Sequence, residues 1–130
     1  MKLIPYLLIL IAMSSVSAYA VTPVDLLNGY VSASGGASPS AQRGEQFFSG
    51  THGGQWSCAT CHGKPPTAEG SHASTGKSIA PLAPAFNPER FTKASVVEKW
   101  FKRNCSDVLK RECTAGEKAD VMSYLLQLKR

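Results

Sequence analysis

One stretch of this 130-residue chain decides how it must fold: Cys58-Ala59-Thr60-Cys61-His62. Two thiols three positions apart on a helical turn can each add to one vinyl group of a haem, and the next residue then places an imidazole below the iron. This spacing is typical of c-type haem attachment. We therefore predict one covalently bound haem c, held through Cys58 and Cys61, with His62 as one axial iron ligand.

Two other kinds of site also use paired cysteines. A thioredoxin-like dithiol would lie in a βαβ pattern, and no strand pattern stands out in this sequence. A zinc site would need two further ligands, which Cys105 and Cys113 could supply. The histidine that follows the second thiol favours haem instead. So does the long proline- and glycine-rich segment 63–90, because such a segment in a small domain needs something large to pack against.

Residues 1–20 have the composition of a secretory signal peptide. Lys2 is followed by the apolar run 3–12 and then by the small-x-small sequence Ala18-Tyr19-Ala20. The apolar run is short for the roughly 30 Å of hydrocarbon that an uncleaved anchor would have to cross. We predict cleavage after Ala20 and export to the periplasm, where cysteines can form disulfides.

The remaining residues, 21–130, are enough for one small domain with a modest core, which we expect to be a monohaem cytochrome c domain. This part contains no second apolar run long enough to span a membrane. Without Lys2 it keeps 13 of the 14 basic side chains against 9 acidic ones, a formal net charge of +4. We expect a negatively charged protein partner and no nucleic acid.

Caps and hydrophobic spacing indicate four helices besides the turn at the motif. They are expected over residues 22–33, 38–48 and 92–105, and from 114 towards the C-terminus. Gly44 and Phe48 resemble the N-terminal helix of class I cytochromes c, where glycine permits close crossing with the C-terminal helix. Tyr124 and Leu125 would lie at that crossing. The sequence therefore predicts an all-α protein with the class I cytochrome c fold, wrapped around one haem.

The second axial ligand is not a usual one. Cytochromes of this class commonly use methionine, but Met1 and Met13 would leave with the signal peptide. Met122 lies within the last predicted helix, where methionine is more often core filler than ligand. His52 and His72 lie in loops, and either could make a bis-histidine site. A methionine-ligated iron is therefore not expected, and bis-histidine ligation stays as an alternative.

Further segments, spread over nearly the whole mature chain, are similar to one family of monohaem cytochromes c. They are Gly76-Lys77, Ile79-Ala80-Pro81-Leu82-Ala83-Pro84, Arg90-Phe91-Thr92, Val97-Glu98-Lys99-Trp100, Arg103-Asn104-Cys105 and Cys113 with residues 114–120. Through these segments the chain resembles the sphaeroides haem protein (SHP) family. In that family an asparagine ligates the iron and two cysteines form a disulfide. The resemblance implies Asn104 as the axial ligand of the oxidised iron and a Cys105–Cys113 disulfide.

The resemblance also implies a function. Members bind oxygen transiently and take electrons from a dihaem cytochrome c. We expect a protein that accepts and donates single electrons and, when reduced, releases Asn104 to bind O2, NO or CO. An amide oxygen is a hard, weak donor that suits Fe(III) better than Fe(II), which agrees with this expectation. A simple electron carrier with bis-histidine or other ligation is one alternative. An oxygen, NO or peroxide reductase is another, although no distal acid–base pair is evident and no catalytic residue is assigned.

Overall fold

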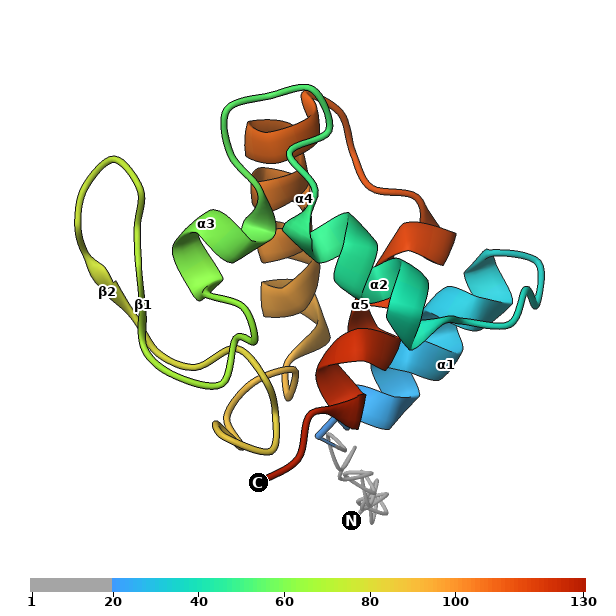
Figure 1. The fold of residues 1–130 in the computed structure, drawn as a ribbon. Helices are drawn as coiled ribbons and strands as arrows, with labels where there is room; N and C mark the ends of the chain where they lie inside the picture. Colours follow the sequence, from blue (N-terminus) through green and yellow to red (C-terminus); the bar gives the residue numbers. More distant parts are fainter. Residues whose placement is uncertain (1–19) are drawn as a thin grey trace, which may run out of the picture.

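The computed structural model describes residues 20–130. The predicted signal peptide lies outside this range except for Ala20. The described part contains five helices and one short hairpin (Figure 1). Their bounds are α1 Pro23–Ala33, α2 Ala41–Ser49, α3 Cys58–His62, β1 Gly70–Ser71, β2 Ser78–Ile79, α4 Ala94–Leu109 and α5 Ala115–Gln127. Among the residues described, no helix is both long and apolar enough to cross a membrane.

The first and last helices begin where their caps predict. Thr22 caps α1 by accepting a hydrogen bond from the Asp25 backbone N–H at 3.1 Å, and the Asp25 carboxylate accepts from the Thr22 N–H at 2.9 Å. Thr114 and Glu117 form the same reciprocal pair at the start of α5. Each pair satisfies backbone donors that the first turn of a helix leaves free, so the local sequence is sufficient to start these helices.

The predicted start of the second helix is two residues early. Ser40, rather than Ser38, caps α2 by accepting from the Arg43 backbone N–H at 3.2 Å. The Ser40 N–H donates to the Asp120 carboxylate on α5 at 2.7 Å. A tertiary hydrogen bond therefore selects between two candidate caps that look alike in the sequence.

Helices α2 and α5 cross in backbone contact. A Cβ placed on Gly44 would lie 1.9 Å from the Asp120 carbonyl oxygen and 3.0 Å from the Tyr124 Cβ. Arg43 adds an ion pair to the Asp120 carboxylate at 2.8 Å. The predicted crossing at Gly44 and Tyr124 is therefore confirmed, and only glycine leaves room for it.

Helix α5 divides the core into two clusters. The first joins α1, α4 and α5 through buried Leu26, Tyr30, Val97, Ala119 and Met122. The second joins α2 and α5 through Phe48, Val121, Tyr124 and Leu125, and Cys58 and Ala59 of α3 pack against it. Met122 is fully buried in the first cluster, which confirms its prediction as core filler.

Helix α4 is longer than predicted. It was expected to end at Asn104 or Cys105, and this is wrong, because it continues to Leu109 and ends at Lys110 with a left-handed φ of 60°. Val108 is buried one turn beyond Asn104, so the extra turn contributes apolar contact. The mostly polar sequence after Asn104 did not indicate this contact. Asn104 consequently lies inside the helix.

The sequence also missed the hairpin. Strands β1 and β2 pair antiparallel, with Gly70 opposite Ile79 and Ser71 opposite Ser78. Each strand has two residues, which is too short for an alternating pattern to be recognised. The structure remains mostly helical, as predicted.

Replacing Gly44 with alanine tests the helix crossing. The added methyl group would overlap the Asp120 carbonyl, so we expect Gly44→Ala to lower the free energy of unfolding by about 1–3 kcal/mol. Urea denaturation of the haem-loaded protein measures this loss. Gly29→Ala is the matched control: Gly29 lies within α1 and nothing is within 4 Å of its Cβ position. Its replacement should stabilise by about 0.5–1 kcal/mol, and equal losses in both variants would contradict the crossing.

Candidate haem site

A five-residue helix carries the whole motif. Ser57 caps α3 by accepting from the Thr60 backbone N–H at 3.2 Å, while the Thr60 hydroxyl accepts from the Ser57 N–H at 2.9 Å. Gly63, with a φ of 79°, ends the helix directly after the histidine. Cys58 and Cys61 are free thiols on this one turn. The local sequence thus gives the two thiols and the imidazole the arrangement that their spacing predicts.

The imidazole of His62 is neutral, and one of its ring nitrogens lacks a hydrogen bond within the described part of the chain. Its ring lies 6.2 Å from that of Phe48, and its Nδ1 is buried without a hydrogen-bond partner among the described residues. Burial, assisted by the Arg90 cation, lowers the pKa of His62 to about 4. An unpaired buried nitrogen is costly unless another group satisfies the ring. The neutral form is the one that ligates metals, so His62 fits the iron-ligand role predicted for it.

The other two readings of the cysteines lose their support. Burial raises the pKa of the Cys58 thiol to about 11, whereas redox-active dithiols have a lowered pKa. Cys105 and Cys113 are bonded to each other and cannot serve as zinc ligands. Within residues 20–130 no three His, Cys, Asp or Glu side chains gather as a metal-ion site. Of the three interpretations of Cys58 and Cys61, haem attachment is the one that agrees with this geometry.

The segment 63–90 folds against the motif. A Cβ on Gly70 would lie 2.0 Å from the Cys61 carbonyl oxygen, so β1 touches the α3 backbone. The Ala73 N–H also donates to the Cys61 sulfur at 3.3 Å. Figure 1 shows the hairpin beside α3. The segment is therefore packed against α3, and Gly70 is needed for this close approach.

Arg90 also belongs to the site, although the sequence predicted no role for it beyond its place in a segment that resembles the SHP family. Its guanidinium donates to two backbone carbonyls, those of Pro81 at 3.0 Å and Ala80 at 2.7 Å. These bonds close the proline-rich loop, and they keep the cation near enough to His62 to affect its pKa. The sequence did contain a signal for this role. Arg90 is a single arginine that follows five prolines, and because prolines lack a backbone N–H, the carbonyls of this segment have few backbone donors.

Asn104 lies half-buried within α4. Its side chain makes no hydrogen bond to any residue of the described range. Helices α3 and α4 do not pack closely on each other, and α4 passes behind α3 in Figure 1. An unpaired amide in a helix interior is available as a ligand, and the axial role of Asn104 stays a prediction.

The two other histidines each make a local contact through one ring nitrogen. His52 is exposed, and its Nε2 lies 2.8 Å from the Phe47 carbonyl oxygen. The Nδ1 of His72 accepts from the backbone N–H groups of Ser74 and Thr75, both at 3.3 Å. Each ring is therefore held in its own loop through one nitrogen, and the bis-histidine alternative stays a prediction.

A disulfide joins Cys105 and Cys113, as the resemblance implies, with the two Cα atoms 5.6 Å apart. Both residues are buried. Since Cys113 precedes Thr114, the cap of α5, the bond ties the end of α4 to the start of α5. The residue beside Asn104 is thus fixed to the helix around which the core is built.

The chain is similar to known proteins over most of its length. Residues 34–125 match the family described as "Domain of unknown function (DUF1924)", a range that contains the motif, Asn104 and the disulfide. The cytochrome c-type protein SHP of Cereibacter sphaeroides is 47% identical over 108 residues, which are 80% of this chain and 82% of that protein. Cytochrome c'' of Methylophilus methylotrophus is 40% identical over 93 residues, 68% of this chain and 65% of that protein.

Solved structures give the same result. Oxidised SHP, described as an oxygen binding cytochrome c, matches with a TM-score of 0.76 and 46% identity, covering 82% of this chain and 97% of that one. Oxidised cytochrome c'' of Methylophilus methylotrophus matches with a TM-score of 0.74 and 35% identity, covering 83% and 95%. The predicted all-α cytochrome c fold and the covalent haem c are thereby confirmed.

Removing the disulfide should loosen this region. We expect the double variant Cys105→Ser/Cys113→Ser to lose about 2–3 kcal/mol of unfolding free energy, because the open chain gains conformational freedom when unfolded. Urea denaturation with and without dithiothreitol measures the effect. The reductant should bring the unmodified protein to the level of the variant and leave the variant unchanged. A variant as stable as the unmodified protein would show that the bond carries no stability.

Proposed function

Since the chain belongs to the DUF1924 family and to the SHP family of c-type cytochromes, we propose that it transfers single electrons and, when reduced, binds a diatomic ligand in place of Asn104. A bound haem c supplies the one-electron couple and an iron position at which such a ligand can bind. The observation that carries the proposal is the Asn104 amide, which is half-buried and free of hydrogen bonds to residues 20–130, while Met122 is buried in the core.

In this proposal Cys58 and Cys61 hold the haem through two thioethers, and His62 ligates the iron on one side. The capped turn of α3 keeps the three groups in register. Phe48 and the burial around His62 keep the imidazole neutral, so it needs no deprotonation before binding. His62 would hold the iron in both oxidation states.

Asn104 is proposed as the ligand on the other side, in the oxidised state only. Its amide oxygen is neutral and hard, so its attraction to the iron weakens when an electron arrives. His52 and His72, each held in its own loop through one ring nitrogen, are the alternative ligands. Release of Asn104 would leave that position for O2, NO or CO.

The proposed setting is the periplasm, after cleavage of residues 1–20, with residues 21–130 as a single monohaem domain. The Cys105–Cys113 bond supports an oxidising compartment. The proposed electron donor is a dihaem cytochrome c or another redox protein, and the net charge of +4 suits a negatively charged one. Turnover as an oxygen, NO or peroxide reductase is the alternative, which an assay with a reductant would reveal.

Replacing Asn104 tests the ligand assignment. Asn104→Val removes the donor oxygen at similar volume, so we expect the ferric absorption spectrum to change to that of iron without a protein sixth ligand. Electron paramagnetic resonance of the same sample should show a high-spin ferric signal. His52→Ala and His72→Ala are the controls and should leave both spectra unchanged. A spectral change in one of these controls, with none in Asn104→Val, would move the assignment to that histidine.

The reduced protein tests the release. We expect a high-spin ferrous spectrum and rapid CO binding, because Asn104 no longer occupies the position. Stopped-flow mixing with CO measures the rate, and Asn104→Val should bind at the same rate once reduced. A sharp low-spin ferrous spectrum that ignores CO would instead identify a simple electron carrier.

A further inference from the structure

Helix α4 is held differently from the other long helices. The backbones of α1 and α2 both pack closely on α5, whereas α4 makes no comparable backbone contact in the described part. Val97 enters the first core cluster, and Phe101 packs against both clusters. The place of α4 therefore depends on a small number of side chains.

Glu98 makes polar ties from α4 to two other helices. Its carboxylate accepts hydrogen bonds from the Tyr30 hydroxyl of α1 at 2.5 Å and from the Lys118 ammonium of α5 at 2.7 Å. The same ammonium lies 5.3 Å from the centroid of the Tyr30 ring and 5.6 Å from that of Phe101. Three helices thus meet at one carboxylate.

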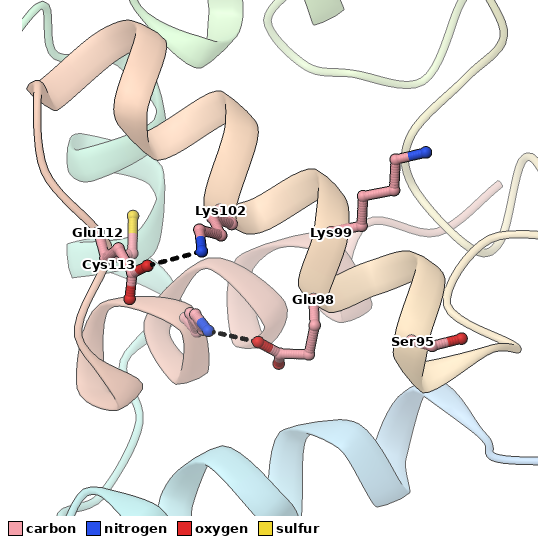
Figure 2. Close-up of a pocket in the computed structure, with 7 residues that line it drawn as sticks. Ser95, Glu98, Lys99, Lys102, Glu112 and Cys113 are labelled. Carbon is pink, nitrogen blue, oxygen red and sulfur yellow. Dashed lines mark hydrogen bonds and ion pairs between the residues drawn. The ribbon is translucent and has the colours of Figure 1, made fainter.

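These ties border a hollow between α4 and the start of α5, with a volume of about 350 Å³ (Figure 2). Figure 2 shows two ion pairs beside it, Lys102 with Glu112 and the α5 lysine with Glu98. The first pair is 3.5 Å long with both side chains about three-quarters exposed, a kind of pair that contributes little. The second is shorter, at 2.7 Å, with Lys118 17% and Glu98 50% exposed. The Glu98 pair is therefore the one that can hold α4 across the hollow.

The charges of this group support a persistent contact. Burial acts to raise the pKa of Glu98, but hydrogen bonds from Lys118 and Tyr30 outweigh it and leave the pKa below its usual value. Burial, then the contact with Glu98, raises the pKa of Tyr30. At neutral pH the carboxylate is ionised and the hydroxyl keeps its proton, so both hydrogen bonds are present.

Asn104 lies between Glu98 and Cys105 on the same helix. Cys105 is fixed to the start of α5 by the disulfide, and Glu98 is fixed to α1 and α5 by hydrogen bonds. A helix transmits a displacement of one turn to the next, because its backbone bonds hold it rigid. Losing either fixed point would let α4 shift and carry Asn104 with it.

We propose that Glu98, held by Tyr30 and Lys118, is a positioning residue that sets how firmly Asn104 ligates the oxidised iron. The proposal rests on the proposed function, since it requires Asn104 to be that ligand. Glu98 itself touches neither the haem-binding motif nor Asn104 through any hydrogen bond of the described residues. Its effect is transmitted through α4 alone.

Cyanide binding to the ferric, haem-loaded protein tests the proposal. Cyanide competes with Asn104, so its apparent affinity rises as the ligated fraction falls. We expect Glu98→Ala to tighten cyanide binding about tenfold. Tyr30→Phe removes one hydrogen bond and keeps the ring, so it should shift the affinity in the same direction by less. This second variant also serves if Glu98→Ala does not fold.

Two further variants separate positioning from charge. Lys102→Met removes a lysine of the same helix whose ion pair is exposed, and its cyanide affinity should equal that of the unmodified protein. Glu98→Lys combined with Lys118→Glu restores an ion pair with reversed charges, and it should return the affinity toward the original value. In an Asn104→Val background, Glu98→Ala should add no further tightening.

The outcomes are distinct. Glu98→Ala and Tyr30→Phe with a lowered unfolding midpoint but unchanged cyanide affinity would overturn the positioning role and leave a purely structural contact. Equal tightening by Lys102→Met would also overturn it. If Asn104→Val alone has the cyanide affinity of the unmodified protein, the proposed function fails, and this inference fails with it.

Discussion

The crossing of α2 and α5 is the contact on which the rest of the structure depends. The Asp120 carbonyl lies where any side chain on residue 44 would be, so the two helices meet backbone to backbone. With α5 fixed in this way, its two faces support the two core clusters. Helix α3 packs on the second cluster, and α4 contributes to the first. Helix α5 therefore sets the positions of the two helices that carry the candidate ligands.

The two candidate iron ligands lie on elements that are held to the core to different extents. His62 lies on a short capped helix that packs on a cluster with Phe48, and the adjoining loop is closed by Arg90. Asn104 lies on a helix held by a few side chains and one disulfide. A ligand that must leave and return is better placed on an element with a few separable ties than on one locked in a core. The proposed release from the α4 side agrees with this difference.

Local signals predicted much of the fold. The caps Thr22 and Thr114 were recognisable because a capping box needs only residues within one turn. Three expectations were wrong or missing: the start of α2, the end of α4, and the hairpin. Each depends on a distant group, namely Asp120 for the Ser40 cap, the burial of Val108, and the backbone of Cys61 against Gly70. Such contacts join residues far apart in the chain, and no short window of sequence contains them.

The sequence by itself determined the haem chemistry, because thioether attachment and the following imidazole depend on spacing within five residues. It also predicted that Met122 fills the core, since a methionine inside a helix with apolar neighbours belongs there, and its burial confirms this. Only the tertiary structure decided the burial that keeps His62 neutral, the Arg90 cation near it, and the hydrogen bonds that Glu98 makes to α1 and α5. Burial and charge proximity arise when distant segments meet, so they exist only in the folded chain.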